Sequence, residues 1–245
     1  GEFSLGHAGF MSIGAYASAI VTTLIQDQTD LPAVLLYLIA IIVGGLAAGL
    51  IGVLVGIPAL RLSGDYLCIV TVAVAEIVRV VLSNFGIPAI TGKATFGKSF
   101  AGIAKVSDYH YVYITMVICI FIMYCYIRSR YGRALIAIRE DRIAAAASGI
   151  NVTKTKVLTF TISAFFAGVS GAIYAHYITT LVPTYFNFSK SSEFLAIVIL
   201  GGSGSLTGSI VAAPILSALP QLISYVVPAF ASYRMLIYEI ILVVV

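Results

Sequence analysis

Long apolar stretches recur along this sequence, and they constrain its fold more than any other feature. A helix needs about 20 consecutive apolar residues to cross the hydrocarbon core of a membrane, and the chain offers about seven or eight such segments. We therefore expect an all-α, polytopic transmembrane helix bundle that forms a single domain over residues 1–245. The apolar stretches are 33–57, 67–83, 111–127, 157–178 and 210–227, with further fragments at 3–25 and 235–245.

Composition excludes a water-soluble fold. Sixty per cent of the residues are hydrophobic and only 10% are charged, whereas an ordinary soluble domain has about 25% charged residues. A membrane β-barrel would show short alternating segments in place of continuous apolar runs, so helices are favoured. The three cysteines lack metal-ligand spacing, and we expect no metal, no cofactor and no disulfide.

The two ends of the sequence look incomplete. It starts without Met, shows no signal peptide and stops inside the apolar run Ile-Ile-Leu-Val-Val-Val. We expect it to be truncated at both ends, with its first helix upstream of Gly1.

Basic residues gather in one connection, residues 128–156, which we call the coupling loop. It holds half of the 14 Lys and Arg residues. Because loops rich in these residues face the cytoplasm, the coupling loop is predicted to be cytoplasmic. Residues 58–66 then lie on the same side, and the connections on the outer side are 26–32, 84–108 and 179–190.

One helix is predicted inside the coupling loop, from Tyr131 to Ser148. The segment has strong helix formers and no Pro, and Gly149 follows as a C-terminal cap. Ile136 and Ile143 are seven residues apart on one face. Such a helix fits either the anionic headgroups of the membrane or a groove on a cytoplasmic partner, and the pattern alone does not choose.

Small residues recur at helical spacing in two of the spans. Lipid gives no hydrophobic drive for helix association, so stripes of this kind predict helices that pack with their backbones close together. The stripes are Gly45, Gly49, Gly52 and Gly56, and then Ala164, Gly168, Gly171 and Ala175.

Residues 92–99 match the phosphate-binding pattern G-x-x-x-x-G-K-[ST]. That motif requires a buried strand before it and a packed helix after it. Here a membrane span precedes it, and the loop is expected outside, away from cytoplasmic ATP. We therefore expect no nucleotide site and no enzymatic activity in this chain.

A few polar positions inside the apolar segments are candidates for a transport path. Glu76 and Arg79, three residues apart, are close enough to pair, either as a structural ion pair that locks two helices or as part of a path lining. His7 is a lone histidine, expected to bond to backbone and not to a metal, and no partner is evident for His110 or His176. The candidate path residues are His7, Glu76, Arg79, Glu193, Gly201, Gly202 and Gly204.

Two segments dense in Gly, Ser and Ala, residues 4–17 and 199–212, are expected to be broken helices. Matched interruptions in two halves often mark the substrate path at mid-membrane. The apolar run that ends at Leu200 is only half a span, so a broken helix, a re-entrant hairpin or a tilted span all remain open.

The coupling loop resembles the corresponding loop of the branched-chain amino-acid ABC transporter permeases, and four further segments resemble that family in the same order. Within the family, the chain is most similar to the LivM-type member of the LivH/LivM permease pair. The five segments are YGRALIAIREDRIAAAASGINVTKTK, SLGHAGFMSIGAYA, GIPALRLSGDYLCIVT, the Glu76-x-x-Arg79 pair and ILGGSGSLTG.

The resemblance implies a multi-pass permease subunit of the inner cell membrane that imports branched-chain or other hydrophobic amino acids. Its implied partners are a second homologous permease, two cytoplasmic ATPase subunits that hydrolyse the ATP, an extracytoplasmic binding protein and the lipid bilayer, with no nucleic acid. Two alternatives stay open: a permease for urea or short amides, and a secondary transporter with Glu76 as an ion relay. The implied ATPase-coupling residues are Arg139, Glu140, Asp141, Ala145, Ala146 and Gly149.

Overall fold

A computed structural model of the chain describes residues 4–28, 32–60, 65–84, 100–101, 103 and 109–226. Within these residues, five helices are long and apolar enough to cross a membrane. They confirm the prediction of an all-α, polytopic helical protein. These helices are α1 (His7–Gln28), α2 (Ala33–Ala59), α3 (Asp65–Asn84), α5 (Tyr109–Arg128) and α8 (Val152–Ile178).

Helices α1 and α8 run parallel and pack closely in the first compact unit, residues 1–191. Gly14 of α1 faces Gly168 of α8, and further along both helices Thr22 of α1 contacts His176 of α8. Both contacts advance in the same direction along the two helices, so α1 and α8 are parallel. Residues from these two helices dominate the buried core of the unit.

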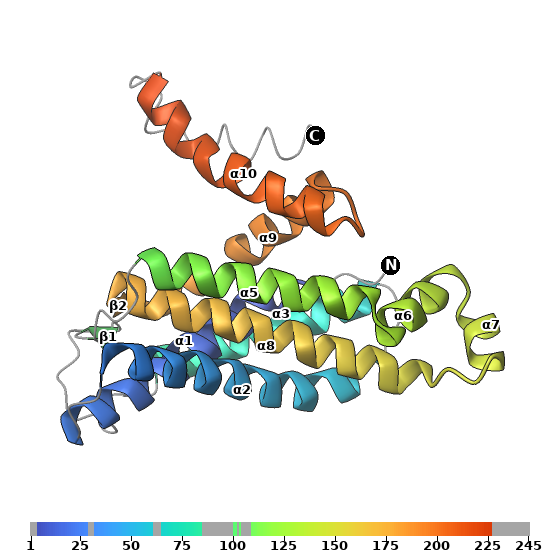
Figure 1. The fold of residues 1–245 in the computed structure, drawn as a ribbon, viewed down its shortest axis with the longest axis horizontal. Coiled ribbons are helices and arrows are strands. Elements are labelled where there is room, and N and C mark those ends of the chain that lie inside the picture. Colours follow the sequence, from blue (N-terminus) through green and yellow to red (C-terminus); the bar gives the residue numbers. More distant parts are fainter. Residues whose placement is uncertain are drawn as a thin grey trace. The chain divides into compact units, whose positions relative to one another are not determined.

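Helix α2 packs on α8 in the opposite direction. Gly52 of α2 faces Ala164, and Gly56, further along α2, faces the earlier residue Phe160. The predicted small-residue stripes of both helices are buried. Figure 1 shows α2 and α8 lying side by side along their lengths. The prediction that these stripes bring helices together is confirmed.

Helices α3 and α5 attach to this core through polar contacts. The Thr71 hydroxyl of α3 accepts a hydrogen bond from the Leu5 N–H just before α1, at 3.2 Å. On α5, the Thr115 hydroxyl lies 3.1 Å from the Tyr37 hydroxyl of α2, and the Tyr126 hydroxyl lies 2.8 Å from that of Thr159 on α8.

Connections lie at two opposite ends of this unit, as Figure 1 shows. At one end, α6 (Arg130–Glu140) and α7 (Arg142–Ala147) form the coupling loop. At the other end, β1 (Phe100–Ala101) pairs antiparallel with β2 (Thr180–Leu181), and the 3₁₀ helix η1 (Pro183–Phe186) follows. The strand pair brings together two connections that the charge pattern had assigned to the same side.

The second compact unit, residues 192–245, contains most of α9 (Phe188–Leu200) and α10 (Leu206–Val226). The predicted interruption after Leu200 is confirmed, because α9 ends there in a turn. The single permease domain over residues 1–245 stays a prediction. The phosphate-binding pattern at 92–99 and the apolar run at 235–245 lie outside the described residues.

The predicted break in residues 4–17 is wrong. Helix α1 continues without interruption from His7. Its glycines meet other helices instead of breaking their own: a β-carbon on Gly9 would lie 2.7 Å from the Cα of Ala75 on α3. The glycines of this segment therefore indicate close packing between helices and not a break in α1.

Candidate functional site

The coupling loop contains two helices and not the single one predicted. Asp141 separates them with an extended backbone, φ −149° and ψ 114°. Its carboxylate accepts hydrogen bonds from the N–H groups of Ile143 at 2.7 Å and Ala144 at 3.1 Å. Aspartate is a preferred N-cap residue. Because Asp141 caps the start of α7, α6 ends before it and does not continue into one long helix. The seven-residue spacing of Ile136 and Ile143 consequently no longer places them on one helix face.

The predicted cap at Gly149 is confirmed. Gly149 has φ +83°, and its N–H donates to the Ala146 carbonyl at 3.0 Å while the Ile150 N–H donates to the Ala145 carbonyl at 3.1 Å. This pair of bonds is the Schellman motif, which favours glycine at the left-handed position. Asn151 then caps α8 through the Lys154 N–H at 3.0 Å. Every helix boundary from Asp141 to α8 is therefore held by specific hydrogen bonds.

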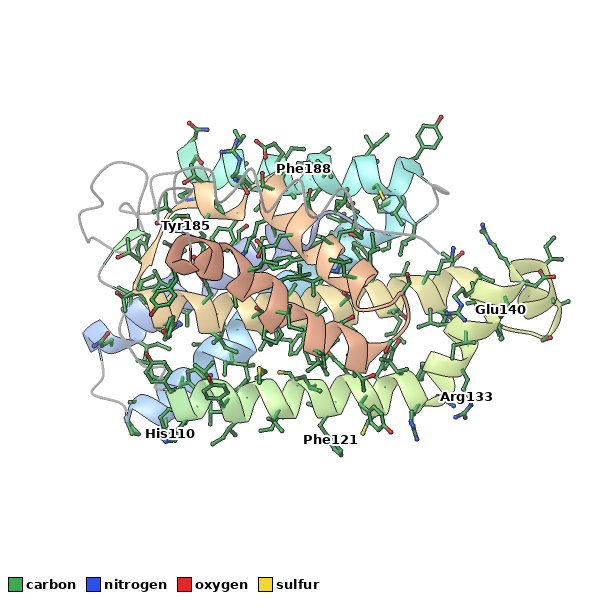
Figure 2. All side chains as sticks on the ribbon, turned by 90° about the horizontal axis from the view of Figure 1, so that it is seen from above. His110, Phe121, Arg133, Glu140, Tyr185 and Phe188 are labelled. Carbon is green, nitrogen blue, oxygen red and sulfur yellow. The ribbon has the colours of Figure 1, made fainter. Side chains whose placement is uncertain are left out.

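Most of the proposed coupling residues lie on the surface of this loop. Arg139 and Glu140 form an exposed ion pair at 2.8 Å, and Figure 2 shows Glu140 projecting at this end of the bundle. Asp141, Ala146 and Gly149 are exposed as well. Ala145 differs, because only 4% of it is exposed and it packs against its own chain.

Glu76 and Arg79 form the ion pair that the sequence suggested. The Arg79 Nε donates to both Glu76 carboxylate oxygens, at 2.9 and 3.0 Å, and Arg79 Nη2 also contacts Glu76 Oε1. Both residues belong to α3, so this pair does not lock two helices together. Their side chains remain 47% and 27% exposed, respectively, on a face that the described chain does not cover.

Two histidines connect α1 to α8. His7 contacts the Ser4 carbonyl through Nδ1 at 3.3 Å, as expected for a backbone-bonded histidine, and Ser163 Oγ of α8 through Nε2 at 2.8 Å. His176 was predicted to have no partner, which is wrong. It is fully buried, with Nδ1 2.8 Å from the Ala172 carbonyl and Nε2 3.0 Å from the hydroxyl of Thr22.

The remaining path candidates belong to the second unit. Glu193 is half-buried in α9, and the turn after that helix contains Gly202 and Gly204 at φ 92° and 96°. A β-carbon on Gly201 would lie 2.5 Å from the Ser209 N atom of α10, so this turn is tight. A common path through these residues and those of α1 and α3 stays a prediction.

A cavity of about 500 Å³ lies between the coupling loop and the bundle, and sequence reasoning missed it. Its lining combines three basic side chains with apolar ones and with the His7–Ser163 contact. The lining comes from four separated stretches of chain, so no local sequence motif predicts the cavity. The lining residues are Ser4, His7, Leu60, Leu67, Leu135, Ile138, Arg139, Arg142, Lys156, Thr159, Phe160 and Ser163.

The described part of the chain has five membrane-length helices, of which α1, α2 and α8 pack through small residues, and a capped helical loop at one end. These features define a multi-pass α-helical membrane protein. The chain belongs to the family described as the branched-chain amino acid transport system permease component, whose model matches residues 1–245. This agrees with the resemblance seen in the coupling loop and the four further segments.

Curated relatives carry the same description. The high-affinity branched-chain amino acid transport system permease protein LivM of Escherichia coli K12 is 34% identical over 247 residues, covering 88% of this chain and 56% of the relative. A probable LivM of Methanocaldococcus jannaschii is 25% identical, covering 84% and 61%. LivH of Escherichia coli K12 is 35% identical, covering 41% and 31%. The chain thus spans little more than half the length of its LivM relatives, and no solved structure matches it.

Proposed function

We propose that this chain is the membrane-spanning permease subunit of an ABC importer for branched-chain or other hydrophobic amino acids in the inner cell membrane. The observation that carries the proposal is the 34% identity to a LivM permease over 88% of the chain. The five membrane-length helices supply the scaffold that such a subunit needs.

The coupling loop is the proposed contact with the ATPase subunits. A transporter that hydrolyses ATP in a separate subunit needs a stiff element to transmit motion, and α6 and α7 are short helices with capped ends. Arg139, Glu140, Asp141, Ala146 and Gly149 are exposed there and available to a partner. Ala145 supports this surface from within.

The other proposed partners are a second homologous permease and an extracytoplasmic binding protein. The similarity of this chain to both LivM and LivH relatives supports the pairing of two related permeases. The proposed path uses the charged residues of α3 and the turn after α9, where helix ends expose backbone groups to a zwitterion. Its residues are His7, Glu76, Arg79, Glu193, Gly201, Gly202 and Gly204.

A secondary transporter is the second candidate, since Glu76 is a carboxylate inside a span and only half-buried. The contact with Arg79 argues against it, because both carboxylate oxygens of Glu76 already accept hydrogen bonds from the Arg79 Nε. An ABC permease for urea or short amides would share the architecture proposed above and differ in its substrate.

Affinity purification of the full-length protein from its own cells tests this proposal. We expect a second permease and two ATPase subunits to co-purify in fixed proportion. Capture of the binding protein on the assembled transporter, followed by mass spectrometry of its bound ligand, would identify the substrate. Recovery of the chain without any ATPase under mild detergent would contradict the importer and favour the secondary transporter.

A further inference from the structure

Tyr16 of α1 carries a buried hydroxyl for which the described part of the chain provides no hydrogen-bond partner. The residue is only 2% exposed. Four other buried hydroxyls of α1 differ, because each donates to a carbonyl of its own helix at 2.7 to 2.9 Å; they belong to Ser12, Ser18, Thr22 and Thr23. A tyrosine hydroxyl lies too far from its own backbone to do the same.

The unpaired hydroxyl of Tyr16 costs stability, because on folding it gives up its bonds to water and gains none in exchange. A phenylalanine would fill nearly the same volume without that cost. Since the hydroxyl is buried, neither lipid nor a neighbouring subunit reaches it. The partner that remains for it is a small polar molecule that enters the helix bundle.

Tyr16 lies at the middle depth of its membrane span. It is the tenth of the 20 residues in the span His7–Gln26. Polar side chains at this depth face the interior of the bundle or a route for ions and substrates. A molecule that crosses the bundle along α1 would therefore meet the Tyr16 hydroxyl halfway.

A stretch of chain without α-helical structure lies against Tyr16. Phe186 of η1 packs edge-on against the Tyr16 ring, with ring centroids 6.5 Å apart, and against the ring of Tyr174 of α8 at 5.9 Å. On both sides of η1 the backbone is extended, at Val182 and at Asn187. Non-helical backbone at membrane depth is tolerated where it is buried in protein or lines a water-filled route, and transporters bind substrates at interruptions of this kind. The aromatic rings add an apolar surface beside the hydroxyl.

We propose that the Tyr16 hydroxyl binds the substrate in the transport path. It donates a hydrogen bond to the carboxylate of a hydrophobic amino acid, whose side chain packs against the rings of Tyr174 and Phe186. A bond from a hydroxyl to an ionised oxygen is stronger than one to a neutral acceptor. Phe186 and Tyr16 are both buried in this structure, so the path is closed here and opens when η1 moves. The inference rests on the proposed function and adds a substrate-binding residue to it.

Uptake of labelled leucine by the full-length protein, assembled with its partner subunits in vesicles, tests the site. Tyr16→Phe removes only the hydroxyl, and we expect maximal uptake to fall at least about tenfold, the loss expected for one hydrogen bond to a charged group. The thermal midpoint of this variant in detergent should stay the same or rise, because no bond within the protein is lost.

Tyr37→Phe in α2 is the matched control. Tyr37 is 3% exposed, and its hydroxyl donates to the Tyr111 carbonyl at 3.3 Å and lies 3.1 Å from the Thr115 hydroxyl. We expect this variant to lose thermal stability and to keep the uptake rate of the protein that stays folded. Unaltered uptake by Tyr16→Phe would overturn the inference. A loss of stability equal to that of Tyr37→Phe would overturn it as well, because the Tyr16 hydroxyl would then be bonded within the protein.

A measurement on the unaltered transporter does not depend on the folding of a variant. A diazirine analogue of leucine is supplied with the binding protein and activated by light during turnover, and the labelled peptides are mapped. We expect labels on α1 around Tyr16 and on η1, and labels absent from both would overturn the inference. A lack of ATP-dependent leucine uptake by the unaltered protein would instead contradict the proposed function, so the two failures are distinguishable.

Discussion

Gly14 of α1 and Gly168 of α8 face each other with backbone against backbone at the centre of the helix bundle. A β-carbon on Gly14 would overlap the backbone of Gly168, and a β-carbon on Gly168 would overlap the Gly44 carbonyl of α2. Backbone atoms cannot move aside as a side chain can. In lipid, where close packing replaces the hydrophobic effect as the force between helices, this contact is central to stability.

Gly14→Ala should therefore lower the free energy of unfolding by about 1 to 3 kcal/mol, the usual cost of overpacking. Gly49→Ala is the matched control, since a β-carbon there would lie 3.6 Å from the Phe165 Cβ in ordinary contact. Thermal inactivation in detergent, followed by size-exclusion chromatography, measures both. Equal midpoints for the two variants would refute the account of this interface.

The Glu76–Arg79 pair gives the second prediction. Glu76→Gln leaves an arginine without its partner on a face of α3 that the described chain does not cover, and we expect a cost of about 1 to 2 kcal/mol because both side chains are partly exposed. Glu76→Gln with Arg79→Met should recover most of that stability. Transport assays on the stable double variant then distinguish the two roles of the pair. Uptake should be lost if the pair lines the path, and it should be kept if the pair is structural.

Substitutions at two adjacent alanines of α7 distinguish an effect on folding from an effect on coupling to the ATPase. Ala146 is exposed and Ala145 is buried against its own chain. Ala146→Trp should leave thermal stability nearly unchanged and abolish both ATPase co-purification and substrate-stimulated ATP hydrolysis. Ala145→Trp should instead lower stability by about 1 to 3 kcal/mol, the range for overpacking. Full coupling in the Ala146→Trp protein would favour a helix that rests on lipid headgroups.

The helix break at Asp141 gives the fourth prediction. Asp141→Ala removes the cap of α7 at a cost of about 1 kcal/mol and allows α6 and α7 to merge into one helix. Asp141→Asn keeps an N-cap acceptor and is the control. We expect ATP hydrolysis in the assembled transporter to lose its dependence on substrate in the alanine variant alone. An unchanged alanine variant would show that the break has no part in coupling.

The membrane spans could be predicted from the sequence within a few residues. The stretch predicted at 33–57 is the helix Ala33–Ala59, and the one at 157–178 lies within Val152–Ile178. The length of an apolar run is a local property of the sequence and does not depend on contacts with distant residues. The glycine stripes were predictable for the same reason, because helical spacing alone defines a face.

Features that depend on distant residues were missed. The partner of His176 is Thr22, which lies 154 positions earlier, and the cavity between the coupling loop and the bundle is lined by four stretches of chain. The break at Asp141 was missed although it is local, since strong helix formers on both sides concealed an N-cap residue. Gly9 and Gly14 were interpreted as a helix break because the sequence does not show that other backbones pack against them.

Uptake into proteoliposomes tests the central claim most directly. The assembled transporter is reconstituted with the binding protein on one side, and uptake of labelled leucine is followed. The importer account predicts uptake that requires ATP on the side of the coupling loop and persists when an ionophore collapses the proton gradient. Uptake without ATP that stops with the ionophore, and also in the Glu76→Gln protein, would contradict it.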